Sequence, residues 1–476
     1  MQLFSIFILA ITILIAILVI IHRVTKIFVT ASSKKYIKPT SAPRRNGKKV
    51  AIQMAIRNED PEVVFRTIDS LLKQTYEDFV LVIIDNNTDD KSLWEPVEAF
   101  CEGNNKLIFT HVENLKGFKS GALNLALEIT PEDCEIISVI DCDTIVDQDY
   151  LSDLIPFFDN PQIMVVQTPS GVQEEILDND FTLGLGVIHR YFHSVFMTYA
   201  HSRRRVPFIG NMGIIRRSIL EEQGQWNGKY LCEDMELSRR LILDRNESIF
   251  VDHAYGKTLL PSNLKNAKQQ FYRWAFGNAQ IFRDFFMKDM TTRTKLAMSY
   301  YPIPSIHANI FCLPYYIITI LLLILSLFYS NQYLNAISFV ILGIYIIEAL
   351  GNLMTHLHLA KKEGFSIKTI AVSMMVLKSL STSFSKGTYA VFRHKTMPFK
   401  ITPHTNENQV NNNLYNLVKY FRLETLLSFA AIALVLINYL YNRSLETSLL
   451  LNAAFIILSS IFQLYLMGII KAEKHG

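Results

Sequence analysis

Cysteine is scarce in this sequence, and the cysteines that are present show no pairing pattern. The 476 residues include five cysteines, with no Cys-x-x-Cys pair and no spacing of the kind that binds zinc. An odd, scattered set of cysteines fits a reducing compartment better than it fits a disulfide framework. Internal repeats and low-complexity tracts are lacking as well.

Charge is also sparse, and its absence is concentrated in long runs. Charged residues make up 19% of the chain and hydrophobic residues 50%, a balance that is high in apolar residues for a soluble enzyme. An apolar run of about 20 residues can cross the core of a bilayer. The uncharged runs cover 4–21, 310–329, 425–441 and 448–470, and a further candidate, 333–355, is interrupted only by Glu348. Residues 45–300 contain no such run, so we expect a soluble domain between one N-terminal span and a C-terminal membrane bundle.

Basic residues follow the first uncharged run, and no charged side chain precedes it. Nine lysines and arginines lie between residues 23 and 49. The positive-inside rule therefore places the segment after the first span in the cytoplasm. A charged leader and a small-residue cleavage site are both missing, so we expect an uncleaved anchor rather than a signal peptide.

Residues 365–392 are apolar but do not fit a simple membrane span. Lys368, Lys378 and Lys386 interrupt the segment, and basic residues flank both of its ends. A spanning helix has one basic side, whereas an amphipathic helix in the interface has no such constraint. We therefore expect an interfacial helix, five spans in total and a cytoplasmic segment over 393–422. If residues 365–392 span the membrane instead, the loops that follow are inverted.

A buried strand that ends in two carboxylates is the central feature of the soluble domain. The stretch Ile136–Asp143 is mostly apolar and leads directly into Asp141 and Asp143. In open α/β sheets, ligands bind beyond the carboxyl ends of the strands. Carboxylates at that place suit a divalent cation and a phosphate, although a strand-ending turn would also explain them.

Strands and helices alternate around this stretch. Further strands are predicted at Lys49–Ala55, Phe79–Ile84, Leu107–His111 and Ile163–Gln167, and helices are predicted to open near Pro61 and Gly117 and to cover Phe181–Ala200. This order is typical of a βαβ sheet that is parallel in its first half, so the predicted fold class is α/β. A nucleotide-binding crevice at the strand ends is the natural corollary.

Two later motifs place acidic and aromatic residues on helices. Glu233 and Asp234 lie at a predicted helix start, where capping and the helix dipole explain acidic residues without catalysis. Gln270, Arg273 and Trp274 share one face of another predicted helix. A tryptophan ahead of a membrane bundle is also explained as an interfacial anchor.

Taken in order, these motifs resemble those of membrane-embedded family 2 glycosyltransferases, close to cellulose, chitin and hyaluronan synthases. The resemblance covers about residues 48–405. The matching set is Arg57-Asn58-Glu59, Asp85, Lys119-Ser-Gly-Ala-Leu-Asn124, Asp141-Cys-Asp143, Glu233-Asp234, Gln270-x-x-Arg273-Trp274 and Phe399-Lys-Ile-Thr402. The resemblance implies a GT-A-type mixed sheet, a nucleotide-sugar domain inserted into an α-helical transmembrane bundle.

The resemblance and the charge pattern together predict five parts and one location. The parts are an anchor over 1–30, a cytoplasmic GT-A glycosyltransferase domain over 31–300, two transmembrane helices over 301–360, an interfacial helix and gating loop over 361–423, and two transmembrane helices over 424–476. The predicted location is the plasma membrane, with several spans and the catalytic domain in the cytoplasm.

The resemblance also implies a role for each motif residue. Asp234 would be the general base on the acceptor hydroxyl. Asp141 and Asp143 would hold Mg²⁺ or Mn²⁺. The nucleotide-sugar site would comprise Asp85, Lys119, Asp141, Arg273 and Thr402, and the acceptor site Glu233, Gln270 and Trp274.

The chain departs from the family pattern in three places. Arg57 stands where the family usually has an aromatic residue, and Cys232 stands where Thr often precedes Glu-Asp. Residues 399–402 resemble the Phe-x-Val-Thr of a gating loop over the nucleotide, but His404 stands where Lys often follows.

We therefore expect a processive inverting glycosyltransferase. It would polymerise a sugar from a nucleotide-sugar donor, with a UDP-sugar as the expected donor, into a β-linked polysaccharide and export it through the membrane bundle. The closest alternative is a non-processive membrane glycosyltransferase that glycosylates a lipid, and a third is a non-catalytic sensor or transporter with a transferase-like domain. Expected partners are the nucleotide-sugar donor, a glycan or lipid acceptor and membrane lipids, without nucleic acid, and the sequence leaves accessory export proteins open.

Overall fold

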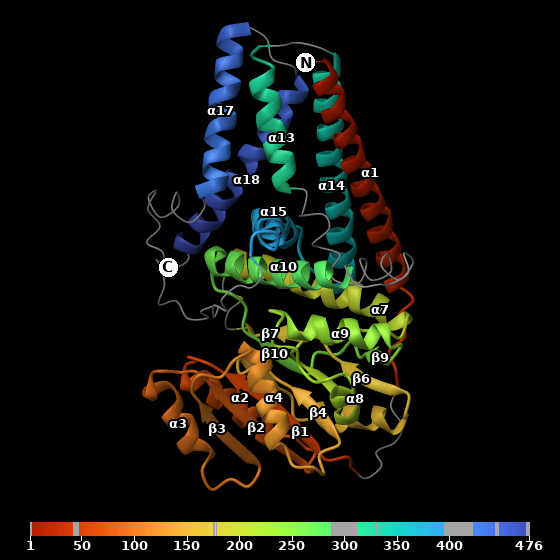
Figure 1. The fold of residues 1–476 in the computed structure, drawn as a ribbon, viewed down its shortest axis with the longest axis vertical. Helices are drawn as coiled ribbons and strands as arrows, with labels where there is room; N and C mark the ends of the chain where they lie inside the picture. The colour runs from red at the N-terminus through yellow and green to blue at the C-terminus, as the bar shows by residue number, and fades with distance from the viewer. Residues whose placement is uncertain are drawn as a thin grey trace.

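The computed structural model describes residues 2–40, 47–174, 177, 179–286, 312–328, 332–394, 422–442 and 447–472. Figure 1 shows an α/β domain at one end and a group of long helices at the other, with helices α10 and α15 lying between them. Helix α10 covers Leu264–Phe286 and α15 covers Ile367–Ala390. The predicted fold class, a mixed α/β domain inserted into a helical bundle, is confirmed.

The main sheet has seven strands in the order β3-β2-β1-β4-β8-β6-β9. Its strands are β1 (Val50–Ile56), β2 (Phe79–Asn86), β3 (Leu107–Val112), β4 (Ile136–Val139), β6 (Ile163–Gln167), β8 (Gly213–Arg216) and β9 (Glu247–Phe250). Strands β1 to β4 pair in parallel, whereas β8 is antiparallel to both β4 and β6. The first half of the sheet is therefore parallel, as the sequence predicts, and its carboxyl ends meet at one edge.

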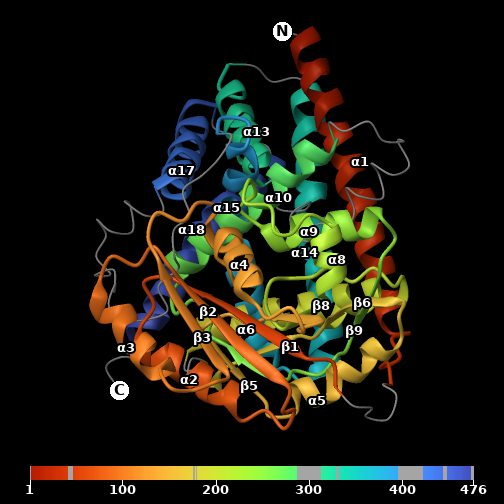
Figure 2. The same cartoon turned by 60° about the horizontal axis from the view of Figure 1, so that its bottom comes forward.

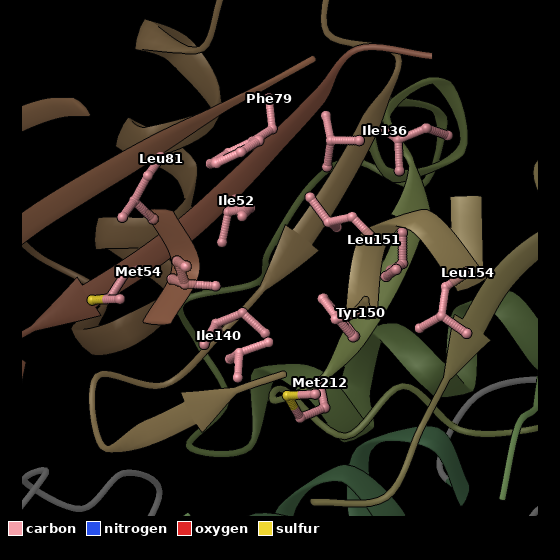
Figure 3. Packing of buried hydrophobic residues seen from close by; sticks show 14 of the residues in the cluster. Ile52, Met54, Phe79, Leu81, Ile136, Ile140, Tyr150, Leu151, Leu154 and Met212 are labelled. Atoms are coloured by element: carbon pink, nitrogen blue, oxygen red, sulfur yellow. The ribbon is translucent and has the colours of Figure 1, made fainter. Parts of the chain in front are cut away.

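Both faces of the sheet are covered, which explains why its central strands are almost uniformly apolar. Along β1, Ile52 and Met54 point to one side and pack with helices α2 (Pro61–Leu72) and α3 (Lys91–Cys101). Ala51 packs on the other side with α4 (Phe118–Ile129), α8 (Arg217–Glu222) and α9 (Glu233–Leu243). Figure 3 shows the first of these cores, in which Tyr150 of α5 (Tyr150–Leu154) lies among the strand side chains. In Figure 2 the strands are seen with α2 and α4 on opposite sides.

A second, three-stranded sheet continues the chain beyond the central strand. It has the order β5-β10-β7, with β5 at Thr144–Val146, β7 at Ser170–Val172 and β10 at Gly256–Thr258. Strand β5 begins directly after Asp143. The small sheet therefore fixes the backbone on the far side of the two carboxylates.

The aromatic-rich segment predicted as one helix contains a change of helix type. It forms α6 (Asp180–Tyr191), a π-helical turn over Phe192–Met197 and α7 (Thr198–Ser202). The side chain of Asn179 caps the start, accepting a hydrogen bond from the Thr182 N–H at 2.9 Å. Hydrophobic periodicity does not separate the α and π forms, because the apolar side chains continue through both.

The apolar runs of the sequence form helices α1 (Gln2–Ser33), α13 (Cys312–Leu325), α14 (Gln332–Glu363), α17 (Arg422–Asn442) and α18 (Thr447–Ala472). Among the residues that the structure describes, three helices are long and apolar enough to cross a membrane: Ser5–Ser33, Gln332–Glu363 and Leu423–Tyr441. Cys312–Leu325 and Thr447–Gln463 are shorter apolar helices. Because membrane-spanning helices expose apolar side chains to lipid, this set supports a membrane protein.

Helix α15 covers the segment that the sequence predicts to be interfacial. It is not one of the three candidate spans in the described chain. In Figure 1 it is seen end-on, below α13 and above α10. The placement of α15 in a membrane interface stays a prediction, as do the five domain boundaries and the cytoplasmic orientation of the sheet domain.

Candidate active site

The two carboxylates that follow β4 lie at the edge where the parallel strands end. The Asp141 side chain is 40% exposed, and its Oδ1 accepts a hydrogen bond from Lys119 Nζ at 2.5 Å. Asp143 is buried, and its Oδ1 accepts hydrogen bonds from the hydroxyls of Thr258 at 3.1 Å and Thr144 at 3.4 Å. Asp141 is therefore accessible and next to the ammonium of Lys119. Asp143 is instead held by hydroxyl groups of β5 and β10.

A glycine-bearing turn brings Lys119 to Asp141. Gly117 precedes α4 in a left-handed conformation with φ of +92°, which glycine adopts without strain. A side chain at Gly121 would clash with the carbonyl oxygen of Lys116, so the turn also requires glycine there. Lys119 Nζ donates a second hydrogen bond to the carbonyl oxygen of Gly210, at 2.9 Å. The lysine thus ties the first half of the sheet to the loop before β8.

That loop also reaches the acidic pair at the start of α9. Gly210 has a φ of +74°, and a Cβ there would lie 3.0 Å from Asp234 Oδ2. Asp234 Oδ1 accepts a hydrogen bond from the Met235 N–H at 2.7 Å, while Glu233 is buried. Part of the capping explanation therefore holds, since one carboxylate does bind its own helix. The same geometry places Asp234 beside the loop that contacts Lys119.

The charges of this group act on one another. Burial alone would lower the pKa of Lys119, but the nearby carboxylates of Asp141, Glu233 and Asp234 outweigh it and raise that pKa. Burial raises the pKa of Glu233, with the charge of Asp234 adding to the effect, and burial also raises the pKa of Asp234. Burial lowers the pKa of Arg273, against the opposing influence of Glu233, Asp141 and Asp234. Four predicted motifs, from α4, β4, α9 and α10, thus meet in one electrostatic cluster.

Glu59 joins the carboxylates of the central strand, although the sequence assigns it no role. Burial, followed by the charges of Asp143 and Asp141, raises the pKa of Glu59 to about 8. Its carboxyl also hydrogen-bonds Cys142, the residue between the two aspartates. The Asn-Glu dipeptide carried a motif signal, but only the packing of β1 beside β4 shows that Glu59 faces the Asp-x-Asp turn.

The carboxylate group can be tested for its fit to a divalent cation. Among the described residues, no set of three or more His, Cys, Asp or Glu side chains is arranged to hold a metal by itself. Asp141 and Asp143 do supply the hard oxygen ligands that Mg²⁺ and Mn²⁺ prefer, and the charges of both act on the neighbouring Glu59. The two aspartates therefore fit a divalent cation as part of its ligand set.

Asp85 lies at the same sheet edge but is enclosed by its neighbours. It is 1% exposed; Oδ1 accepts from the Thr88 hydroxyl at 2.7 Å and Oδ2 lies 2.7 Å from His111 Nδ1. The ring of Trp94 stacks on His111 with centroids 4.0 Å apart. Strand β1 separates Asp85 from the Asp141 side of the sheet. No sequence motif marked His111 or Trp94, because they come from a short strand and a helix without a recognisable pattern.

Two of the three predicted acceptor residues, Gln270 and Trp274, lie on α10, and the third, Glu233, is the first residue of α9. Trp274 is 38% exposed, and its ring is 5.1 Å from that of Phe271. Gln270 is half-buried on the same helix. An exposed aromatic face at this place suits stacking against the apolar face of a sugar. Thr402 and the rest of the predicted gating loop, 399–402, lie outside the described residues.

The loop before β8 contributes more than the sequence indicates. Besides the contacts of Gly210, Asn211 Oδ1 accepts the Asp141 backbone N–H at 3.1 Å, and Asn211 Nδ2 donates to the Thr144 hydroxyl at 3.0 Å. Asn211 therefore clamps both sides of the Asp-x-Asp turn. A glycine-bearing loop predicts tight geometry, but it does not predict which turn the loop contacts.

Comparison with known proteins finds similarity to glycosyltransferases over about half of the chain. Residues 136–360 match the family model described as glycosyl transferase family group 2. A glucomannan 4-beta-mannosyltransferase from Cyamopsis tetragonoloba is 30% identical over 254 residues, which cover 49% of this chain and 46% of the relative. Glucomannan 4-beta-mannosyltransferase 7 from Arabidopsis thaliana is 28% identical over 253 residues, 49% of this chain and 43% of that protein. The chain thus spans about half the length of the curated relatives it matches.

A solved structure shares the fold. The mannosyltransferase from Pyrobaculum calidifontis, determined with GDP-Man and Mn²⁺, has a TM-score of 0.52 to this chain. The match covers 81% of this chain and 98% of that one, at 14% sequence identity. This likeness establishes a GT-A-like fold, which agrees with the sheet order described above. Over about half of its length, and in having several apolar helices, the chain is similar to membrane-embedded family 2 glycosyltransferases of the synthase kind.

Proposed function

We propose that this chain is a processive inverting glycosyltransferase that extends a β-linked polysaccharide from a nucleotide-sugar donor. The observation that carries the proposal is the contact of Lys119 with Asp141 and with Gly210, which lies against Asp234. The charges of these carboxylates also act on Arg273. The positive charges of Lys119 and Arg273 would bind a diphosphate, and a neighbouring carboxylate would be the base for an acceptor hydroxyl. The exposed ring of Trp274 on the neighbouring helix adds a surface for the acceptor sugar.

The proposed chemistry is one displacement at the anomeric carbon. Asp234 accepts the proton of the acceptor hydroxyl, and that oxygen forms the new bond to the anomeric carbon. The bond between the anomeric carbon and the diphosphate oxygen breaks, and the nucleoside diphosphate leaves with the electron pair. Attack from the opposite face inverts the configuration, so an α-linked donor gives a β-linkage. The planar guanidinium of Arg273 and the ammonium of Lys119 oppose the charge on the leaving diphosphate.

Asp141 and Asp143 are the residues that would hold a divalent cation, Mg²⁺ or Mn²⁺. Such an ion, when bound, supplies charge stabilisation to the leaving diphosphate. The fold-sharing mannosyltransferase contains Mn²⁺, which favours a divalent ion at this edge without selecting between the two metals.

A mannosyl donor is favoured over the UDP-sugar that the sequence analysis expected. The matching relatives are named as glucomannan 4-beta-mannosyltransferases, and the fold-sharing structure contains GDP-Man. We therefore place GDP-mannose first among donors and a β-1,4-linked mannan first among products. Asp85 is proposed to act on the nucleobase side of the site, together with His111, which holds its carboxylate.

The helical bundle is proposed to provide the exit path for the polymer. Helices α10 and α15 lie between the sheet edge and the long helices, so a growing chain on Trp274 would start next to the bundle. The plasma membrane, with the sheet domain in the cytoplasm, is the location we propose, on the charge pattern around α1. Membrane lipids and accessory export proteins are proposed as its surroundings and partners on the same basis.

A donor screen tests the proposal. Purified protein in detergent or nanodiscs is supplied with GDP-mannose, UDP-glucose and UDP-N-acetylglucosamine in turn, with Mg²⁺ or Mn²⁺, and nucleoside diphosphate release is measured. We expect release from GDP-mannose above the other donors. Failure of every donor, although a nucleotide still binds, would instead favour the non-catalytic sensor.

Product extraction separates the two enzymatic alternatives. A labelled product that precipitates in alcohol supports the polysaccharide, whereas a product that partitions into organic solvent supports the lipid acceptor. The second result would leave the donor chemistry in place and overturn the polymer.

A further inference from the structure

A buried charge cluster joins the acceptor helix to the membrane bundle. Glu424, the third residue of α17, has a side chain that is 0% exposed. Its Oε1 lies 2.5 Å from Lys268 Nζ on α10, and its Oε2 lies 3.3 Å from Lys386 Nζ on α15. The Thr382 hydroxyl of α15 also donates to this carboxylate. One side chain at the start of a candidate membrane span thus holds two helices of other parts of the chain.

Burying charged groups opposes folding, so this cluster is expected to have a role other than stabilising the fold. Removing charged groups from water costs several kcal/mol per ion, so a buried ion pair often adds little to stability compared with apolar packing. Buried polar groups are better attested as devices that fix one register among alternatives. Lys268 is 10% exposed and Lys386 is 33% exposed, so water reaches the ammonium of Lys386 more readily than that of Lys268. The arrangement therefore fixes how α10, α15 and α17 meet.

The residue after Lys386 brings α15 directly onto the acceptor motif. A side chain at Gly387 would clash with the carbonyl oxygen of Tyr272 and lie 2.9 Å from the Cβ of Ala275. These two residues flank Arg273 and Trp274. Adjacent positions on α15 therefore contact Glu424 on one side and the backbone of the Gln-x-x-Arg-Trp helix on the other.

Aromatic packing continues from this crossing to Trp274. The ring of Phe384 on α15 meets the edge of Phe271 on α10, with centroids 5.1 Å apart and planes at 88°. Phe271 in turn lies 5.1 Å from Trp274. The orientation of the exposed tryptophan ring thus depends on how α15 sits against α10, and that packing is held by Glu424.

We propose that Glu424 is a positioning residue for the acceptor site. Acting through Lys268 and Lys386, it sets the rotation of α10 and α15 and thereby presents Trp274 to the growing end of the glycan. This inference rests on the proposed function, but it concerns the acceptor and leaves the donor chemistry at Asp141 and Asp234 unaltered. A perturbed cluster should weaken acceptor use while donor hydrolysis continues.

The test uses the full chain in nanodiscs with GDP-mannose as donor and β-1,4-linked mannohexaose as the acceptor probe. Glu424→Gln should raise the acceptor KM by roughly ten-fold, while GDP release without acceptor stays within about two-fold of wild type. Lys386→Gln is the milder variant, because the lysine is one-third exposed, and Lys386→Arg should restore wild-type behaviour. If Glu424→Gln does not fold, the Lys386 pair decides the outcome.

A control comes from another ion pair between helices. Arg23 on α1 pairs with Glu348 on α14, and the hydrogen bonds described for Arg23 go to Glu348 and Asn352 of α14 rather than to α10 or α15. Glu348→Gln removes the same kind of group and should leave the acceptor KM unchanged. An unchanged acceptor KM in Lys386→Gln and Glu424→Gln, or an equal loss of donor hydrolysis, overturns the positioning role. Absence of GDP release by the wild type would overturn the proposed function instead.

Discussion

At the residue scale, the first prediction concerns Asp234, whose carboxylate is proposed to be the general base. Asp234→Asn should lower the transfer rate by roughly 10²- to 10⁴-fold, the usual contribution of a general base, while the donor still binds. The measurement is GDP release with acceptor alongside donor affinity by calorimetry. Asp244→Asn is the matched control, because Asp244 is the C-cap residue of the same helix and its side chain accepts a hydrogen bond from Gln223. Near-normal turnover in Asp234→Asn would remove the base assignment.

The raised pKa of Asp234 gives a second residue-scale prediction. Burial raises that pKa above the ordinary aspartate value, and a base acts only when it is ionised. Transfer should therefore fall as the pH drops through the raised pKa, and the acid limb of kcat/KM should lie above about pH 4. The profile is measured after confirming that activity returns when acid-treated enzyme is brought back to neutral pH. A limb at or below the ordinary aspartate value would contradict the assignment.

A third prediction at the residue scale concerns Asp143, the buried aspartate of the Asp-x-Asp turn. Asp143→Asn should raise the Mn²⁺ concentration needed for half-maximal donor binding by roughly ten-fold, because it removes one oxygen ligand charge. Asp147→Asn serves as the control, since Asp147 is exposed and lies four residues further along the chain. An unchanged metal titration in Asp143→Asn would exclude this residue as a ligand.

The sequence predicts the residues of this site better than it predicts their environment. The motifs located Asp141, Glu233 and Arg273, because each lies in a recognisable pattern next to an element boundary. The contacts of Glu59 and Asn211 escaped prediction, because they arise from elements that are distant in sequence and meet only in the folded sheet. The enclosure of Asp85 by His111 has the same origin, a neighbouring strand in register.

At the element scale, α10 carries Trp274, which is proposed to bind the acceptor rather than the donor. Trp274→Ala should shorten or stop polymer growth, because the acceptor loses its stacking surface, while GDP release without acceptor changes little. Chain length is read by size-exclusion chromatography of the labelled product. Phe282→Ala is the control, since Phe282 lies further along the same helix and its exposed fraction, 36%, is close to the 38% of Trp274. A product of unchanged length would show that Trp274 is only a membrane anchor.

The strands of the first half of the main sheet, and β6, were predictable, whereas β5 and β7 to β10 were not. Strands β1, β2, β3 and β6 fall within two residues of the predicted positions, because a covered parallel sheet requires apolar runs. The start of α2 at Pro61 was predictable for the same kind of local reason, an N1 proline, and the structure adds Asp60 as its capping side chain. The π-helical turn at 192–197 and the contact between α15 and α10 were not, because both depend on packing partners that are distant in the sequence.

At the scale of the whole molecule, helices α10 and α15 lie between a GT-A-like sheet domain and a set of apolar helices. The proposal of a nucleotide-sugar donor rests on the charge cluster at the sheet edge. The proposal of a polymer product rests on α10 and its place next to the bundle. The two halves can fail separately. A lipid-linked product would leave the first intact and remove the second.

The most direct test is product analysis with the purified chain. Supplied with GDP-[¹⁴C]mannose and Mn²⁺, it should form an alcohol-insoluble product that an endo-β-mannanase degrades to soluble oligosaccharides. Asp234→Asn should form none under the same conditions. Label that is recovered only in organic extracts, or a polymer that resists the mannanase, would contradict the account.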